Sequence, residues 1–582
     1  MRRLLILTLA AAAFGSSLTA YAQRQLDRDR YAYPVLNVAG LCSANFGEMR
    51  PNHFHSGIDI KTDGVEGKPI AATAEGYIAR IVVSPGGYGR ALYVVHPEGT
   101  MSVYGHMSRF RSDLDSLISD RRYRSKRNAI DIYLPEGKYP VGRGDIIGFS
   151  GNTGNSFGPH LHFEIRDMRD NSTLNLIRQG VIPVRDTISP KIEAIHYVAA
   201  DTVASVPVHS EPRSIAIRQT GKGRYEAVQP VKAAAAGFFI IEVSDRKNDV
   251  NNRFGIYRIT QKVDGNTVFE YRADGFRIED SRYCNSISYY PKQLSARCEV
   301  IRLARQEGCP DKFFTRLVDR GVLKIGDGQR RHVAIEVEDD CRNVSTLEFD
   351  VIPGGSPVET VEEALQPQTI VRRSEKYYRQ TDNFSISMPA GTLYETAAID
   401  CRLSDITPSA GGSAVDILTE AYDVADASIP LHKAATVAIR AFVPADMQKY
   451  AAMAIVSPNG KLSYAGGKYI NGAIEAQTRR LGTFCAVIDN VAPVIRPRFE
   501  NGSDLRRRTS VTFAVSDNFS GIKDYAAYID NQWVPLDYSS LHGTFTLRFD
   551  HRNYPYDARH SLTVTATDNC GNKAVWEGNF YR

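Results

Sequence analysis

The chain has 582 residues, of which 43% are hydrophobic and 24% are charged, and its formal net charge is +5. This composition is typical of soluble globular protein, and the length is too great for one hydrophobic core, so we expect three to five domains. The weak and dispersed positive charge does not favour a nucleic-acid partner.

Residues 1–22 have the pattern of a cleavable signal peptide. The charged start "MRR" precedes the apolar run "LLILTLAAAAFG", which is too short to span a bilayer. The small-residue sequence Ala20-Tyr21-Ala22 predicts cleavage after Ala22, and no lipid-attachment cysteine follows this site. No later stretch is long and apolar enough for a membrane helix. We therefore expect an exported protein, periplasmic or secreted, with no membrane span.

The sequence pattern of residues 23–186 predicts an antiparallel β domain. The runs "YIARIVVS" and "ALYVVHPEG" flank "PGGYGR", a hairpin pattern in which the glycines allow positive φ. An insertion at 110–141 interrupts this pattern. Its first half is polar and partly helical in period, and its second half resembles a further hairpin.

The tail of the chain contains an internal repeat. Four segments recur in the same order, among them "DTISPKI" and "DNVAPVI", the two "VSD" segments, and "IEVEDDCRN" and "VTATDNCGN". They predict two Ig-like β-sandwich units, at 187–353 with an insert at 272–330 and at 489–582. Residues 356–488 alternate apolar residues with Pro/Gly turns, and "MPAGTLY" resembles ZU5-like domains. The fold class is therefore mainly all-β, with one antiparallel domain followed by three β-sandwich units.

Eight cysteines lie at positions 42, 284, 298, 309, 341, 401, 485 and 570. None has C-x-x-C spacing, so neither a cysteine zinc site nor a redox motif is indicated. After export to an oxidising compartment some of them can pair. We expect buried thiols and a few structural disulfides, whose connectivity the sequence does not determine.

The candidate site lies in the first domain, where six of the thirteen histidines fall between residues 53 and 162. In a strand, His160 and His162 share one face, and the even spacing of His55 and Asp59 lets an extended segment present both on one face. Two such segments side by side would bring two histidines and a carboxylate together. That set, with water in the fourth position, suits a catalytic zinc. Spacing alone does not choose between His160 and His162.

Three motifs in this order, "FHSGIDI", "VYGHMS" and "GPHLHFEI", resemble the lysostaphin-type (LytM-like) zinc metallopeptidases, which cut peptidoglycan peptides. The resemblance covers about residues 46–170. It implies that His55, Asp59 and His162 bind Zn²⁺. It also implies that His106 and His160 are catalytic, polarising the attacking water and stabilising the oxyanion. The insertion departs from the family pattern, and we expect it to reshape one wall of the substrate groove.

The predicted function is that of an exported zinc metalloendopeptidase acting on peptidoglycan stems or cross-links. One alternative is a non-catalytic or autoinhibited LytM-type regulator that activates cell-wall amidases, although every ligand and both catalytic histidines are present here. Another is a non-haem iron oxygenase, which also uses two histidines and a carboxylate, but export and the lack of an indicated oxoacid-binding arginine disfavour it. We expect the β tail to be a spacer or targeting module that contacts amidases or envelope proteins, or to fold back over the groove.

Overall fold

The computed structural model describes residues 24–203, 206–325, 328–358, 369–550 and 555–582. The predicted signal peptide lies outside the described residues. Strands dominate the described chain, and its longest helix, α1 (Ser112–Ser125), has 14 residues. This confirms the mainly all-β fold class. No helix of the described residues is long and apolar enough to cross a membrane.

The first domain is built on one large antiparallel sheet. Its strands follow the order β1 (Cys42–Ala44), β4 (Ile58–Lys61), β13 (His160–Asp167), β8 (Thr100–Gly105), β7 (Arg90–Val95), β6 (Gly76–Val83) and β10 (Ile130–Tyr133). A smaller sheet contains β5 (Pro69–Ala71), β12 (Ile146–Phe149) and β9 (Arg109–Phe110). Because side chains alternate along a strand, the core residues Ile58, Ile60, Leu161 and Phe163 leave the opposite face of β4 and β13 for polar groups.

The insertion forms α1 and two short strands, β10 and β11 (Pro140–Val141). The expected hairpin is wrong, because β10 and β11 do not pair with each other. Both pair with β6, at Ile130↔Val83 and Pro140↔Tyr77. The eight-residue β6 is long enough to accept the two segments one after the other along the same edge.

The first β-sandwich unit has two sheets. One contains β16 (Val206–His209), β15 (Lys191–Val203), β21 (Ala236–Ser244), β25 (Glu299–Arg302), β17 (Arg213–Ile215) and β27 (Leu323–Lys324). The other contains β18 (Ile217–Gly221), β19 (Arg224–Ala227), β29 (Val344–Pro353), β28 (Arg331–Glu338), β22 (Arg258–Val263), β23 (Asn266–Arg272), β26 (Phe314–Leu317) and β20 (Val231–Ala233). The insert predicted at 272–330 also supplies β24 (Gly275–Arg277). This strand pairs with β14 (Ser172–Leu174) and so extends the sheet of the first domain.

The central unit packs a sheet of β31 (Tyr377–Gln380), β32 (Phe384–Met388), β37 (Ala435–Arg440), β41 (Ala473–Thr478) and β40 (Lys468–Ile470) against a second sheet. That sheet contains β34 (Cys401–Leu403), β36 (Tyr422–Val424), β42 (Gly482–Ile488), β38 (Ala451–Val456), β39 (Leu462–Tyr464) and β35 (Asp416–Ile417). Phe384, Ile439 and Phe484 belong to the buried core of the unit.

The C-terminal β-sandwich unit has two sheets. The first contains, in order, β43 (Val494–Pro497), β44 (Ser510–Ser516), β48 (Thr544–Arg548) and β47 (Leu536–Ser539). The second contains, in order, β46 (Gln532–Val534), β45 (Ile522–Ile529), β49 (Arg559–Asp568) and β50 (Lys573–Tyr581). It shares strand pairings with the first sandwich: β43 with β44 corresponds to β15 with β21, and β49 with β50 corresponds to β28 with β29. The Ig-like assignment of the two units and the domain boundaries stay predictions.

All eight cysteines are free thiols, so the expected disulfides are not found. Six of them are buried. Burial raises the pKa of Cys485 to about 12, as expected for a thiol in an apolar core. The cysteines are spread over all four units, and each unit is instead held by its own apolar core.

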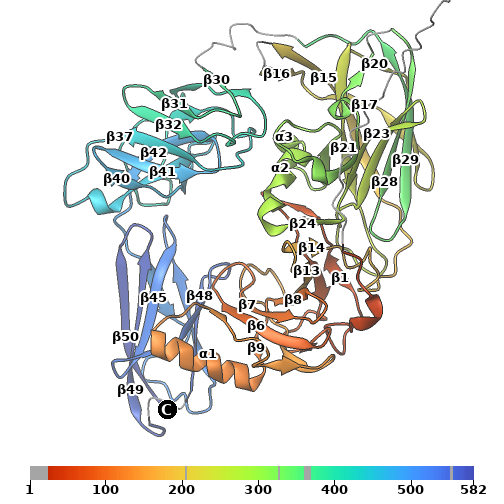
Figure 1. Cartoon of the computed structure of the whole chain (residues 1–582). Helices are drawn as coiled ribbons and strands as arrows, with labels where there is room; N and C mark the ends of the chain where they lie inside the picture. Colours follow the sequence, from red (N-terminus) through yellow and green to blue (C-terminus); the bar gives the residue numbers. More distant parts are fainter. Residues whose placement is uncertain (1–23, 204–205, 326–327, 359–368, 551–554) are drawn as a thin grey trace, which may run out of the picture.

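The C-terminal unit returns to the first domain and lies against α1, so the four units follow one another around a ring (Figure 1). Asp537 joins the two ends, accepting from Arg90 Nη2 at 3.2 Å and pairing with Arg122 Nη2 at 2.8 Å. The two guanidinium groups outweigh the burial of Asp537 and hold the pKa of its carboxyl well below the usual value. Asn128 donates to the Tyr525 carbonyl at 2.7 Å, which adds a neutral contact beside the ion pairs.

Replacing Asp537 by alanine leaves two buried guanidinium groups without their shared partner. We expect this change to weaken the contact by about 2–3 kcal/mol, less than for a fully buried pair because 25% of the Asp537 side chain is exposed. Small-angle X-ray scattering should show a larger radius of gyration, and hydrogen exchange in α1 should become faster. Glu577→Ala, an exposed change on the same unit, is the control. Identical scattering and exchange in the two variants would contradict the role of Asp537.

Candidate metal centre

Three predicted ligands converge on one point of the first domain. His55 follows the short strand β3 (His53–Phe54), and Asp59 lies in β4, directly opposite His162 of β13 in the antiparallel register. His55 Nε2 lies 3.0 Å from Asp59 Oδ1 and 3.0 Å from His162 Nδ1. Asp59 Oδ1 and His162 Nδ1 are 2.9 Å apart. All three side chains are buried.

Hydrogen bonds on the outer side of each ligand fix which atom faces the cluster. His55 Nδ1 donates to the Asn45 carbonyl at 2.7 Å, and His162 Nε2 donates to Glu164 Oε1 at 2.8 Å. Because these oxygens can only accept, His55 Nε2 and His162 Nδ1 are the atoms left for a ligand. Arg50 holds the other oxygen of Asp59 at 3.0 Å, so that Oδ1 faces the two imidazoles.

The donor set and its spacing fit zinc. Bonds of about 2.0–2.2 Å at tetrahedral angles place zinc ligand atoms about 3.3 Å apart. The three atoms here are 2.9–3.0 Å apart, within a small adjustment of that value. Two imidazole nitrogens and one carboxylate oxygen, with room for a further ligand, match the catalytic rather than the structural type of zinc site.

The protonation of the cluster reflects burial and its neighbours. Burial lowers the pKa of His55 to about 4. Burial has the same tendency at His162, but hydrogen bonds to Asp59 and Glu164 outweigh it and raise the pKa of His162 to about 9. Because a metal ligand must be deprotonated, a cation bound here would displace a proton from His162.

The two histidines predicted to be catalytic lie beside the cluster. His106 directly follows β8 and has a φ of 62°, and its Nδ1 donates to the Thr153 carbonyl at 2.8 Å. His160 Nδ1 donates to the Gly158 carbonyl at 2.8 Å, and its Nε2 lies buried 3.5 Å from Asp59 Oδ1 without a hydrogen-bond partner. The ring centroids of His106 and His160 are 4.7 Å apart. Burial and the adjacent His160 lower the pKa of His106 to about 3, so this imidazole is neutral near pH 7.

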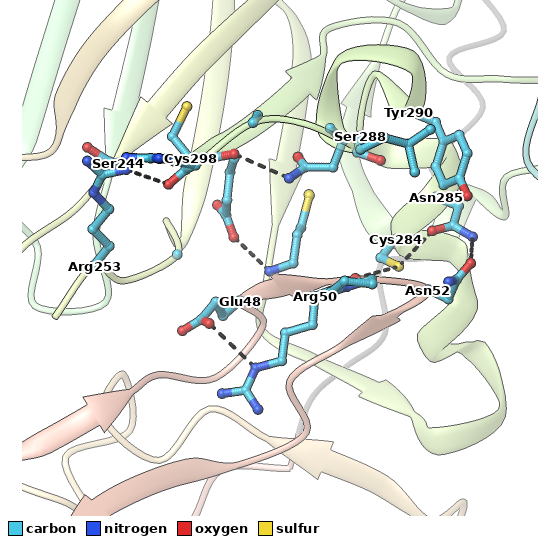
Figure 2. A pocket seen from close by; sticks show the side chains of 18 of the residues that line it. Glu48, Arg50, Asn52, Ser244, Arg253, Cys284, Asn285, Ser288, Tyr290 and Cys298 are labelled. Carbon is cyan, nitrogen blue, oxygen red and sulfur yellow. Dashed lines mark hydrogen bonds and ion pairs between the residues drawn. The ribbon is translucent and has the colours of Figure 1, made fainter. Parts of the chain in front are cut away.

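A cleft of about 650 Å³ opens over these residues and is lined by Asp59, His106 and His160. Phe157 stands at its rim with 88% of the residue exposed. A neighbouring pocket of about 490 Å³ shares Glu48 and Arg50 with the cleft and runs toward the first β-sandwich unit. Figure 2 shows the Arg50 side chain turned toward Glu48, with Cys284 and Asn285 of that unit on the other side of the Arg50 backbone. No residue of α1 lines the cleft, so the helix of the insertion does not form the expected groove wall.

Sequence reasoning missed the residues that orient the ligands. Glu164 carried a usable signal, since it lies two positions after His162 on the same face of β13. Arg50 and Asn45 carried none, because their roles depend on how the chain before β3 folds over the site. His96 is held between the Glu75 carbonyl and Ser102, away from the cluster, as a structural histidine.

Residues 53–119 match Peptidase family M23, and residues 368–489 match a Zu5-like domain. The chain carries a peptidase family M23 domain of the LytM type. This confirms the resemblance seen in the three histidine motifs, and the second match agrees with the ZU5-like character expected for the central unit.

The curated relatives match about a fifth of this chain. The DD-carboxypeptidase/endopeptidase Mpg of Neisseria meningitidis serogroup B is 35% identical over 113 residues, 19% of this chain and 20% of its own. An uncharacterized metalloprotease of Haemophilus influenzae is 31% identical over 118 residues, 20% of this chain and 19% of its own. The chain thus spans about a fifth of the length of these curated relatives.

Solved structures give matches of similar extent. The catalytic domain of the M23 protein EnpA from Enterococcus faecalis is 26% identical, with a TM-score of 0.17, and the match covers 22% of this chain and 80% of that one. The catalytic domain of lysostaphin from Staphylococcus simulans is 24% identical, with a TM-score of 0.16, over 24% of this chain and 82% of that one.

Glu164→Gln should weaken zinc binding without removing a ligand. A glutamine keeps the size of the side chain but loses the charge that orients His162 and makes its imidazole more basic. We expect affinity to fall by about 10- to 100-fold, measured by competition with a chromophoric chelator. Glu66→Gln, an exposed change in the same domain, should bind zinc as the unaltered protein does. Equal affinities in both variants would show that Glu164 does not support the ligand.

Proposed function

We propose that the protein is an exported zinc metalloendopeptidase that hydrolyses peptide bonds in the stems or cross-links of bacterial peptidoglycan. The observation that carries this proposal is the convergence of His55 Nε2, Asp59 Oδ1 and His162 Nδ1 beside two further histidines in an open cleft. The name of the Neisseria relative, a DD-carboxypeptidase/endopeptidase, agrees with a cell-wall peptide as the substrate.

Zinc held by His55, Asp59 and His162 would polarise the scissile carbonyl and lower the pKa of an attacking water. The chain's own residues supply the remaining chemistry. His160 presents Nε2 without a partner next to the cluster, in the position of a base that accepts a proton. Burial and the adjacent His160 keep His106 neutral, while its hydrogen bond to the Thr153 carbonyl orients the ring, and it can stabilise the developing oxyanion once it carries a proton.

The surroundings of the cluster indicate how a peptide would be held. Phe157 offers an exposed apolar surface at the rim of the cleft. Arg50, Arg253, Arg297 and Arg480 line the adjoining pocket, and guanidinium groups bind carboxylates well. Peptidoglycan stem peptides carry several carboxylates, which suits this pocket.

The C-terminal unit packs on α1 and Arg90, and none of its described residues lines the cleft. The first sandwich contributes Asn252 to the lining. A tail that folds back over the groove stays an alternative, and the last unit gives it no support. Export through the predicted signal peptide would place the enzyme in the periplasm or outside the cell, where the tail can contact envelope proteins, including cell-wall amidases.

The first test is mass analysis of the products released from purified peptidoglycan. We expect the unaltered protein to consume cross-linked peptide dimers, and a chelator or His162→Ala to abolish this activity. His106→Gln and His160→Gln should each lower the rate by about 10²- to 10⁴-fold while the protein keeps its zinc. A folded, zinc-loaded protein that leaves peptidoglycan intact but stimulates an added amidase would favour the regulator instead.

Phe157→Ala tests the substrate contact. Loss of the exposed ring should raise KM several-fold and change kcat little, because the ring touches the substrate rather than the reacting atoms. The matched control is Phe442→Ala, since Phe442 is 89% exposed but belongs to the central unit. If both variants have unchanged KM values, Phe157 does not contact the substrate.

A further inference from the structure

Each of the two sandwich repeats has three aspartates that converge where the chain enters the unit. In the first repeat they are Asp186, Asp245 and Asp339, and in the second Asp489, Asp517 and Asp568. The six positions correspond in the repeated segments "DTISPKI"/"DNVAPVI", "VSD"/"VSD" and "EDDCRN"/"TDNCGN". In each trio one carboxylate oxygen per residue lies within 4.8 Å of the other two.

The first repeat places a cation of its own among these groups. The ammonium of Lys247 lies 3.7 Å from Asp186 Oδ2 and 3.5 Å from Asp245 Oδ2, and it also pairs with Asp340. Lys247 is 2% exposed. A buried ammonium that contacts three carboxylates offsets part of their mutual repulsion.

The second repeat lacks this cation. Lys247 lies two residues after Asp245, and the residue two positions after Asp517 is the apolar Phe519. Among the described residues no lysine, arginine or histidine forms an ion pair with Asp489, Asp517 or Asp568.

The carboxylates of the second repeat also have unused acceptors. Asp489 is 0% exposed, and its Oδ2 has no hydrogen-bond partner. Asp517 Oδ1 lacks one as well, although its Oδ2 accepts from the backbone of Phe519 and Gly521. A buried carboxylate oxygen without a donor or a cation is strongly unfavourable, so these atoms point to a ligand that neutralises them.

We propose that Asp489, Asp517 and Asp568 bind a divalent cation of the calcium class. The three ligands supply oxygen only, with no imidazole or thiolate among them. Such a set favours a hard cation such as Ca²⁺ over zinc. This site is separate from the peptidase centre and does not depend on the function proposed for it.

The position of the site suggests what the cation does. Asp489 directly follows β42, the last strand of the central unit, and Asn572 of the C-terminal unit donates to its carbonyl at 2.8 Å. A cation shared by Asp489 and by the two aspartates of the C-terminal unit would therefore fix the angle between these units. The Lys247 ammonium has the equivalent place between the first domain and the first sandwich, since Asp340 also accepts from Asn45 at 3.0 Å.

The test is a titration of the full-length protein, dialysed into calcium-free buffer, with CaCl₂ by isothermal calorimetry. We expect one saturable site with a Kd in the range of about 10⁻⁶–10⁻³ M, together with a rise in the unfolding temperature. Asp517→Asn should weaken binding at least about tenfold. Asp524→Asn, an exposed change in the same unit, should leave it unaltered.

A second variant keeps the proposal testable if Asp517→Asn does not fold. Phe519→Lys would place an ammonium where the first repeat has one, and it should abolish calcium binding and the calcium-dependent rise in unfolding temperature. No saturable binding at millimolar calcium would overturn the proposal. Binding that survives in both variants would place the cation elsewhere in the chain and would overturn it equally.

Discussion

The candidate site depends above all on the register between β4 and β13. In this register Asp59 lies opposite His162, and the neighbouring pair Ile60 and Leu161 faces the core. A slip of one residue would turn every side chain of a strand to the other face, placing the aspartate in the core and an isoleucine among the histidines. The burial of Ile58, Ile60, Leu161 and Phe163 is therefore what holds the ligands in place, so the apolar core determines the geometry of the polar site.

The β tail also takes part in this geometry, through the groups that orient the histidines. The Asn45 carbonyl accepts from His55, and the Asn45 amide bonds to the Gly255 carbonyl at 2.9 Å and to Asp340, both in the first sandwich. The Thr153 carbonyl holds His106, and the Thr153 hydroxyl accepts from the backbone of Arg90, whose guanidinium pairs with Asp537. The first and last units of the tail thus each reach a residue that positions a histidine.

Much of the site could be predicted because it obeys local rules. The i, i+2 spacing of His160 and His162 and the even spacing of His55 and Asp59 follow from strand geometry, and the family resemblance selected His162 rather than His160 as the third ligand. What the sequence could not show is long-range. The pairing of β24 with β14 joins segments about a hundred residues apart, and the contact of Asp537 with Arg90 joins the two ends of the ring. The prediction of a hairpin in the insertion was wrong for the same reason, since β10 and β11 both pair with the edge of β6 instead of with each other.

Buried charges at the junctions between units explain how the ring keeps one arrangement. Desolvation makes such ion pairs weak contributors to net stability, whereas apolar contact would stabilise the units at many relative angles. A guanidinium or ammonium that must meet a carboxylate of another unit is satisfied at only one angle, and any other leaves a buried charge unpaired. Arg90 and Arg122 with Asp537 impose this condition at the closing contact, as Lys247 with Asp186 and Asp340 does at the first junction. Because Asp340 also holds the residue that orients His55, the same ion network that sets the angle between two units sets the position of a metal ligand.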